Sequence, residues 1–222
     1  MVKLDMVSKR YRTGSGDVAA LEEVSMQVTE GEFIVVRGPS GSGKTTLLLV
    51  TGGMLRVSSG SVFVNGEDVY RLPEGQRARF RAENIGFVFQ MFHLIPYLNV
   101  LENVLLPAGA GNRDRDRTVA LELLERFRLS ERASHKPSEL SAGESQRTAI
   151  ARAMFGRPRL ILADEPTGNL DPENAEEVIK YLAEYHLEGG TVIVVTHGRV
   201  VDQYADRIMS LQNGRIVKEE LR

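Results

Sequence analysis

The sequence contains no cysteine. Disulfide bonds, cysteine-ligated zinc, iron–sulfur clusters and thiol catalysis are therefore excluded. Long apolar runs are also missing: the longest, residues 160–163 and 192–195, have the length of a strand, whereas a membrane-spanning helix needs about 20 apolar residues. The first twelve residues lack the apolar core of a signal peptide. We therefore predict no membrane span, so that any role at a membrane depends on a second polypeptide.

Neither sign of charge is in large excess, since 28 Lys and Arg residues face 30 Asp and Glu residues, for a net charge of −2. This balance argues against a protein whose main partner is nucleic acid or an anionic membrane surface. Charged residues make up 26% of the chain and hydrophobic residues 42%, as in ordinary globular domains. A length of 222 residues suits one large domain, and we predict a single domain over 1–222 with no nucleic-acid partner.

The pattern of apolar residues changes twice along the chain. The first third has short Val- and Phe-rich runs between glycine-containing turns, which predict strands at 2–7, 24–28, 32–36 and 61–64. Asn65-Gly66 predicts a hairpin turn, and apolar residues at helical spacing predict helices between about 99 and 135. The last third alternates, with apolar strands predicted at 159–163 and 191–196 and a helix at 174–186.

Strands that are apolar throughout, in alternation with a helix, indicate a parallel sheet covered on both faces. The fold class that we expect is α/β, with a parallel-sheet core, an antiparallel β layer and an inserted α-helical subdomain. The core and the β layer are expected at about 1–90 and 155–222, and the helical subdomain at about 91–154.

The strongest motif is a glycine-rich run that matches G-x-x-x-x-G-K-[ST] in full: Gly38-Pro39-Ser40-Gly41-Ser42-Gly43-Lys44-Thr45. It follows a predicted strand and precedes a helix predicted at 45–50. Backbone N–H groups of such a loop surround phosphate oxygens, and the helix N-terminus adds positive potential. Lys44 can reach the β- and γ-phosphates, and the Thr45 hydroxyl can ligate Mg²⁺. The alternative is a plain Gly/Ser-rich connection, but the strand–loop–helix context favours a phosphate loop.

Two adjacent acids, Asp164 and Glu165, follow the apolar strand predicted at 159–163. They are expected at the carboxyl end of a parallel strand, where ligands collect in open α/β sheets. One carboxylate can hold Mg²⁺ through water, and the next can polarise an attacking water. A strand that ends in two acids is often only a solvated strand end, but together with a phosphate loop it completes a nucleotide site.

Residues 140–147, LSAGESQR, directly precede a helix that is predicted to run to about Arg157. A serine hydroxyl and glycine amides at a helix N-terminus can form a second anion site. Because the phosphate loop already supplies one such site, the second suggests that two chains share each nucleotide. The alternative is plain helix capping, with Ser141 as the N-cap and Glu144 completing a capping box.

These residues resemble the signature motif of ATP-binding cassette (ABC) ATPases, and other motifs of that family occur in order along essentially the whole chain. Gln90, at the end of a strand predicted at 85–89, matches the Q-loop glutamine, and residues 168–171, Gly-Asn-Leu-Asp, match the D-loop. His197 matches the switch histidine, and Tyr11 lies where an aromatic ring of the family stacks on adenine. The resemblance implies a P-loop (RecA-like) core.

The resemblance also implies roles for individual residues. Glu165, His197 and Gln90 are expected to be catalytic, and Thr45, Gln90 and Asp164 to hold the metal. The expected nucleotide-binding residues belong to both anion sites and the adenine position: Tyr11, Gly38, Pro39, Ser40, Gly41, Ser42, Gly43, Lys44, Thr45, Thr46, Ser141, Ala142, Gly143 and Glu144. The cofactors implied are ATP and Mg²⁺.

Three positions differ from the usual family residues. Ala142 stands where the signature motif usually has glycine, Glu144 where glutamine is common, and Gly198 where the related subgroup usually has aspartate. We predict that the Glu144 carboxylate caps its helix by facing backbone N–H groups. Asp171-Pro172 likewise predicts an N-cap followed by the first residue of a helix.

Residues 87–90, 94–96 and 102–107 resemble the macrolide-export, lipoprotein-release and cell-division group of this family (MacB, LolD and FtsE types). This resemblance implies an ATP-hydrolysing subunit that powers a bacterial transporter through a separate integral membrane permease. It further implies a head-to-tail homodimer or cassette pair at the cytoplasmic face of the inner or plasma membrane, held there by the permease. The mostly apolar residues 91–98 either pack in the core or form a partner surface.

Two other functions fit parts of the pattern. An ABC ATPase of the cell-division type drives a membrane complex without transport, and the sequence does not separate that role from transport. An ABC ATPase that acts on nucleic acid is disfavoured, because those relatives usually carry two cassettes or long coiled-coil or basic insertions, whereas this is a single cassette of nearly neutral charge.

Overall fold

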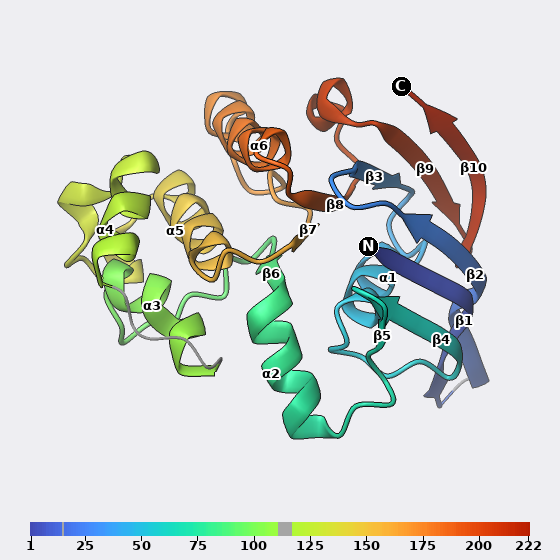
Figure 1. The fold of residues 1–222 in the computed structure, drawn as a ribbon. Coiled ribbons are helices and arrows are strands. Elements are labelled where there is room, and N and C mark those ends of the chain that lie inside the picture. Colours follow the sequence, from blue (N-terminus) through green and yellow to red (C-terminus); the bar gives the residue numbers. More distant parts are fainter. Residues whose placement is uncertain (15, 111–116) are drawn as a thin grey trace.

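The computed structural model describes residues 1–14, 16–110 and 117–222 and folds them into two sheets and a group of helices (Figure 1). The strands are β1 (Val2–Thr13), β2 (Gly16–Val28), β3 (Phe33–Arg37), β4 (Ser59–Val64), β5 (Glu67–Asp68), β6 (Ile85–Val88), β7 (Leu160–Asp164), β8 (Thr191–Thr196), β9 (Arg207–Gln212) and β10 (Arg215–Leu221). The α-helices are α1 (Lys44–Thr51), α2 (Glu74–Asn84), α3 (Val100–Ala110), α4 (Arg117–Arg126), α5 (Ala142–Phe155) and α6 (Pro172–Leu187). Short 3₁₀ helices cover Ser130–Arg132, Pro137–Glu139 and Val200–Tyr204.

The larger sheet of the described chain has six strands in the order β10-β9-β3-β8-β7-β6. All are parallel except β10, which pairs antiparallel with β9. Successive residues of β7 enter different cores: Leu160 and Leu162 pack with α1 and the smaller sheet, whereas Ile161 and Ala163 pack with α3, α4, α5 and α6. Both faces of the sheet are covered, which is why its central strands are continuous apolar runs. The predicted α/β class with a parallel core is confirmed.

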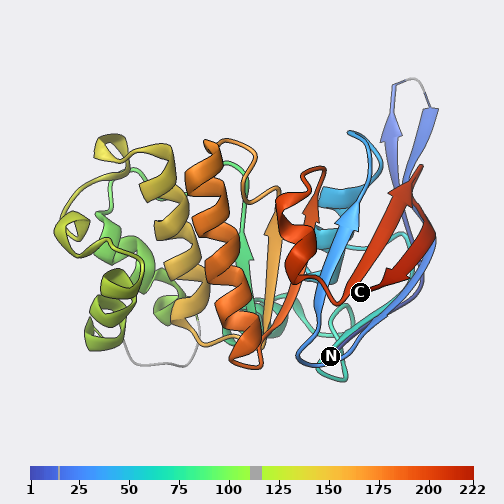
Figure 2. The ribbon, with the colours of Figure 1, turned by 90° about the horizontal axis from the view of Figure 1, so that it is seen from above.

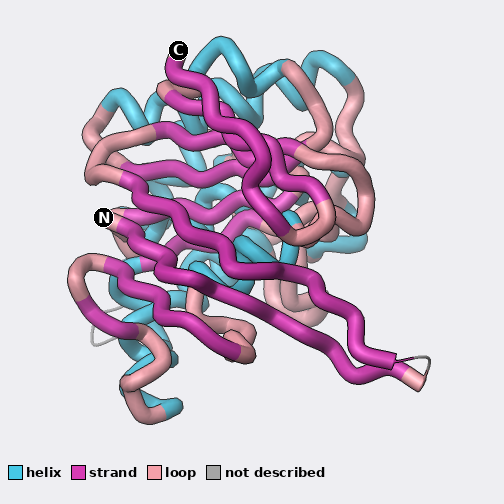
Figure 3. Tube along the Cα trace, turned by 90° about the vertical axis from the view of Figure 1, so that its right-hand side faces the viewer, coloured by secondary structure: helices cyan, strands magenta, loops and turns pink. Residues whose placement is uncertain are grey.

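The smaller sheet, with the order β2-β1-β4-β5, is antiparallel. Asn65 and Gly66, with φ of 54° and 79°, form the turn between β4 and β5, so the predicted hairpin is confirmed. Strands β1 and β2 are much longer than the sequence pattern predicts, and they form a hairpin arm that extends away from the rest of the fold (Figures 2 and 3).

Helices α3, α4 and α5 gather at one side of the fold, with α6 beside α5 (Figures 1 and 2). Their apolar residues, Val104, Leu124 and Ile150 among them, form one buried cluster with the adjacent face of the larger sheet. The three helices fall at residues 91–154, except that α5 ends one residue later at Phe155. The proposed division of the chain into core and subdomain stays a prediction. In the described parts of the chain, no helix is both long and apolar enough to span a membrane.

Helix α2 is not predicted by the sequence pattern. It has no buried residue and so presents no apolar stripe, which is the signal by which periodicity detects a helix. Pro73 at its N-cap and Glu74 in its first turn are its start signals. Apart from β1 and β2, the other predicted elements differ from the structure by one or two residues at their ends; β6, for example, ends at Val88.

Candidate functional site

Residues predicted to bind nucleotide follow neighbouring strands of the larger sheet. Strands β3, β8, β7 and β6 are adjacent and parallel in that order, so their carboxyl ends lie at one edge, where α/β sheets bind ligands. An open pocket of about 610 Å³ lies at this edge, which we call the edge pocket. It is lined by Ala20, Ser40, Gly41, Gly43, Lys44, Thr45, Thr46, Gln90, Glu165 and His197.

Glycines allow the loop between β3 and α1 to take its shape. Gly41 and Gly43 have φ of 78° and 103°, a left-handed backbone that favours glycine. Gly43 also lies against the backbone carbonyl of Ala20, so that a Cβ at this position would collide with the main chain of β2. The conformation of the loop therefore depends on the absence of a side chain at residue 43.

The opposite side of the loop is held by the turn between β9 and β10. Gly38 lies against the Leu211 carbonyl, again too close for a Cβ. The Gly214 amide donates to the Ser42 carbonyl at 3.0 Å. Segments that are far apart in the sequence thus fix the phosphate loop from two sides before any ligand is bound.

The N-terminus of α1 has no side-chain cap and no acidic residue in its first turn. Its unpaired amides and the helix dipole therefore favour an anion. Lys44 Nζ donates to the carbonyls of Gly38 and Pro39, at 2.8 and 3.1 Å, and lies 3.8 Å from Glu165 Oε1. A buried ammonium group next to free amides is suited to hold the phosphate chain of a nucleotide.

Thr45 and Asp164 bring two oxygen donors together beside this loop. Thr45 Oγ1 donates to Asp164 Oδ1 at 3.2 Å. Burial raises the pKa of Asp164, and the hydrogen bond from Thr45 opposes that shift. A hydroxyl and a carboxylate oxygen fit Mg²⁺, which nucleotide sites commonly hold by one or two protein oxygens together with the phosphates.

The Glu165 carboxylate is fixed by groups from the end of β8. Oε2 accepts from Thr196 Oγ1 at 2.8 Å and from the His197 amide at 3.2 Å, and Oε1 lies 2.9 Å from His197 Nδ1. The side chain of Glu165 is 12% exposed, whereas that of His197 is 72% exposed. Glu165 has a φ of 42°, a left-handed conformation that costs about 1 kcal/mol or more for a non-glycine residue. The surrounding contacts thus hold this carboxylate at the pocket edge despite backbone strain.

Gln90 follows β6 and lines the edge pocket with an exposed side chain. Its carbonyl accepts from Asn169 Nδ2 at 3.0 Å, and its side-chain amide lies close to Gly168. The segment after Glu165 is therefore in direct contact with the segment after β6.

Tyr11 is the predicted nucleotide-binding residue whose position differs most from expectation. It lies on the hairpin arm opposite Val18, is 39% exposed, and does not line the edge pocket in the described chain. Ala20, which the sequence analysis missed, lines the pocket instead. The role of Ala20 could have been predicted only from the length of strands β1 and β2, because these long strands place residue 20 beside the phosphate loop. Stacking of Tyr11 on adenine stays a prediction.

The residues 141–144, which we call the signature turn, lie outside the edge pocket of their own chain. Ser141 Oγ accepts from the Glu144 amide at 3.2 Å, and Glu144 Oε2 accepts from the Ser141 amide at 2.8 Å, so the predicted capping box is confirmed. Arg132 Nε donates to Glu144 Oε1 at 2.7 Å and, with the capping bonds, lowers the pKa of Glu144 to about 2. Ser141 and Ala142 are exposed beside the buried Gly143, so the turn is open to a second molecule.

A model of the ABC transporter family matches residues 21–168. This chain belongs to the ABC transporter family. The cassette is 42% identical to the uncharacterized ABC transporter ATP-binding protein YvrO of Bacillus subtilis, over 99% of this chain and 97% of that protein. It is 44% identical to the macrolide export ATP-binding/permease protein MacB of Burkholderia pseudomallei, but its match covers only 34% of that protein. The cassette thus spans about a third of the length of MacB.

Solved structures agree with the assignment to this family. The cassette MJ0796 in a dimeric, post-hydrolysis state bound to ADP and Pi superposes with a TM-score of 0.93 at 40% identity, covering 100% of this chain and 98% of that one. MJ0796 comes from Methanocaldococcus jannaschii. The predictions of family, of fold class and of an ATP-hydrolysing cassette are confirmed, and the MacB relatives fit the predicted group.

Proposed function

We propose that two copies of this cassette pack head to tail, with each ATP held between the edge pocket of one copy and the signature turn of the other. The observation that carries this proposal is the separation of the two anion sites. The edge pocket is open, and the exposed Ser141 of the same chain does not line it. The dimeric state of the relative MJ0796 bound to ADP and Pi supports a pair of cassettes that binds nucleotide.

Each side chain of the edge pocket then has a chemical task. Lys44 exchanges its carbonyl partners for the β- and γ-phosphates, where it offsets their charge. Thr45, Asp164 and Gln90 would hold Mg²⁺, which would neutralise phosphate charge. Glu165 orients the attacking water and accepts its proton, while His197 contacts the γ-phosphate. The hydrogen bonds from Thr196 and His197 keep the carboxylate in place for this step.

A groove of about 420 Å³ supports a membrane partner. It is lined largely by apolar side chains, including Met54, Phe87, Phe89, Leu106 and Pro107, with Arg81 and Arg152 beside them. None of residues 91–98, next to this groove, is buried, and Met91 and Tyr97 are 69% and 74% exposed. Exposed apolar side chains in one region are typical of a binding surface.

We infer that the groove takes a segment of an integral membrane permease. MacB carries a permease in the same polypeptide as its ATP-binding part, and this cassette spans about a third of that length. The permease that binds in this groove holds the cassette at the cytoplasmic face of the inner membrane. Closure of the cassette pair passes through Gln90 to this surface, because Gln90 directly precedes it.

The substitution Glu165→Gln tests the shared site most sharply. Glutamine still orients a water but cannot accept its proton, and loss of a general base typically slows hydrolysis by about 10²- to 10⁴-fold. ATP binding survives because Lys44 and Thr45 are unchanged, so trapped ATP stabilises the pair. Sedimentation velocity is expected to show a dimer with ATP–Mg²⁺ and a monomer with ADP.

The second substitution Ser141→Arg, added to Glu165→Gln, separates the two interpretations of residues 141–144. The large side chain blocks the signature turn, so the dimer is expected to disappear while each monomer still binds ATP. Persistence of an ATP-bound dimer in the double variant would show that the turn is only a capped helix start. As a second readout, hydrolysis by the unmodified cassette should rise more steeply than linearly with protein concentration.

A further inference from the structure

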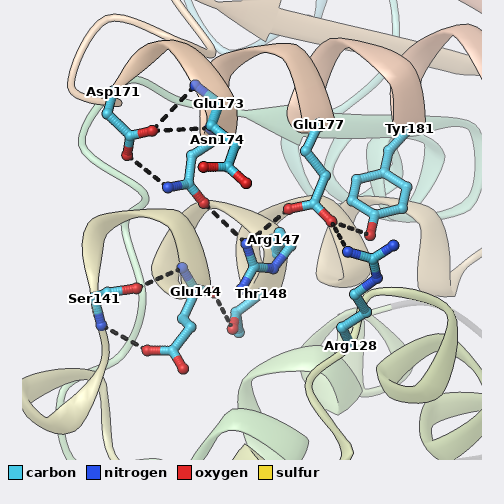
Figure 4. Close-up of polar contacts among 10 residues, drawn as sticks. All are labelled: Arg128, Ser141, Glu144, Arg147, Thr148, Asp171, Glu173, Asn174, Glu177 and Tyr181. Atoms are coloured by element: carbon cyan, nitrogen blue, oxygen red, sulfur yellow. Dashed lines mark hydrogen bonds and ion pairs between the residues drawn. The ribbon is translucent and has the colours of Figure 1, made fainter.

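Polar side chains connect the start of α6 to the first turns of α5 (Figure 4). Asp171 is the N-cap of α6, as predicted, and its Oδ1 accepts from the amides of Glu173 and Asn174, each at 3.1 Å. Asn174 Nδ2 donates to the second oxygen, Oδ2, at 2.5 Å. The bonds from Asn174 lower the pKa of the Asp171 carboxyl and so favour its ionised form.

Asn174 is held on its other side by α5. Arg147 Nη1 donates to Asn174 Oδ1 at 3.1 Å and to Glu177 Oε2 at 3.0 Å. The Arg147 side chain is only 13% exposed. Both ends of the Asn174 amide are therefore engaged, and the amide cannot turn without losing a bond to a charged group.

The same amide lies directly against the signature turn. A Cβ at Gly143 would collide with Oδ1 and Cγ of Asn174. Gly143 is buried at this contact, whereas Ser141 and Ala142 are exposed next to it. The position of the Asn174 amide consequently sets how the signature turn lies on α6.

The neighbouring residue of α5 holds the opposite end of the segment that links Glu165 to α6. Gln146 Nε2 donates to the carbonyl of Pro166, the residue after Glu165, at 2.7 Å in a buried position. Between the two ends, Asn169 donates to the carbonyl of Gln90. Residues 165–174 are thus attached to α5 at both ends, by Gln146 and by Arg147.

We propose that Asn174 is a positioning residue that couples the two half-sites of the cassette pair. Its bond to Asp171 ties Asn174 to the segment that carries Glu165. Its contact with Gly143 positions the signature turn, which the same chain presents to the other nucleotide. A change at one ATP is transmitted in this way to the turn that faces the other ATP. This inference rests on the shared site proposed above.

The substitution Asn174→Asp, made in the Glu165→Gln cassette, tests the coupling. Aspartate keeps the acceptor for Arg147 but places a second carboxylate against that of Asp171. The hydrogen bond between residues 171 and 174 is then replaced by repulsion. The dissociation constant of the ATP-bound dimer is expected to rise by about tenfold or more, the size of a coupling that depends on a hydrogen bond to a charged group. Fluorescent ADP should bind the monomer with unchanged affinity, because the edge pocket is not altered.

A reciprocal exchange distinguishes positioning from loss of structure. The double variant Asp171→Asn/Asn174→Asp restores the hydrogen bond with donor and acceptor reversed, and asparagine is as good an N-cap as aspartate. It should recover dimerisation to within about threefold of the Glu165→Gln cassette. If Asn174→Asp merely disrupted the structure, it would lower both the melting temperature and the affinity for ADP. The reciprocal exchange would then not restore dimerisation.

Two arginines provide a second test that does not depend on Asn174→Asp. Arg147 and Arg128 both pair with Glu177, but only Arg147 also touches Asn174, and Arg128 is 80% exposed. Arg147→Met is expected to weaken the dimer as Asn174→Asp does, whereas Arg128→Met should leave it unchanged. A Glu165→Gln cassette that never dimerises with ATP overturns the shared site and this inference with it. A cassette that dimerises equally well with Asn174→Asp and Arg147→Met overturns this inference alone.

Discussion

The two helix N-termini that the sequence marks as anion sites are built in opposite ways. α1 has Gly43 as its N-cap, with no side-chain cap and no acid in its first turn. α5 has Ser141 as its N-cap in a complete capping box, and Glu144 lies in its first turn. The first helix leaves its amides to a ligand, whereas the second satisfies two amides with its own side chains.

Because of this difference, we expect the two helix starts to contribute unequally to nucleotide affinity. An uncapped helix start with a buried Lys44 can hold a polyphosphate by itself. The capped start of α5 has already used the Ser141 and Glu144 amides, and it carries a carboxylate of its own. We therefore expect the edge pocket to supply most of the affinity for nucleotide, and we expect the signature turn to complete the site only in the proposed dimer.

The largest effect is expected from Lys44→Ala, which removes the cation from the uncapped helix start. Loss of charged hydrogen bonds to the phosphates should weaken ATP binding by about a hundredfold or more. The signature turn does not line the edge pocket of its own chain, so Ser141→Ala should leave ATP binding by the isolated chain unchanged. Isothermal titration of both variants measures the contrast, and equal affinities for the two would contradict it.

The same substitution at the two helix starts should have different consequences. Gly43→Ala places a Cβ on a left-handed residue and against the Ala20 carbonyl, which is expected to destabilise the fold by about 1–3 kcal/mol and to abolish ATP binding. In Gly143→Ala the added Cβ first meets the side chain of Asn174 and not the main chain, and alanine favours a helix more than glycine does. We expect ATP binding to survive there, with the loss confined to dimerisation. Urea unfolding and ATP titration of each variant test both statements.

The smallest effect concerns the charge of the capping box. Glu144 has its pKa lowered from 4.5 to about 2, chiefly by Arg132, so its ionised form stabilises the folded state above about pH 4.5. That contribution is lost as the pH falls from about 4.5 to 2, where the carboxylate becomes protonated. Glu144→Gln should melt below the parent at pH 7, and the difference should vanish in the acid window. A difference that stays constant down to pH 2 would contradict the assignment; Glu131→Gln, on the 3₁₀ helix next to Arg132, is the matched control.

Most of the edge pocket could be predicted because its residues lie on strands and turns with strong local signals. The glycine spacing of residues 38–45 is typical of a phosphate loop. The apolar run of β7 leads directly to Asp164 and Glu165, and that of β8 leads to His197. Parallel strands then bring these ends together without further information.

The parts that could not be predicted depend on contacts between distant segments. Ala20 reaches the pocket because β2 begins at Gly16, well before the strand that the pattern predicts at 24–28. Residues 18–21, Val-Ala-Ala-Leu, do not alternate between apolar and polar, so they give no signal of a strand. Asn174 has no local mark at all, since its role follows from the packing of α6 on Gly143. Helix α2 buries no residue and therefore has no apolar stripe from which the sequence pattern could predict it.

The two supports of the phosphate loop also bear on the biosynthesis of the cassette. Gly38 rests on the Leu211 carbonyl and Ser42 on the Gly214 amide, so a nascent chain that ends before β9 holds every phosphate-loop residue but lacks one wall of the loop. We therefore expect tight ATP binding to begin only after β9 and β10 have folded onto the sheet. Because a ligand stabilises only the form that binds it, cellular ATP protects finished molecules from unfolding and proteolysis and gives no protection to partial ones.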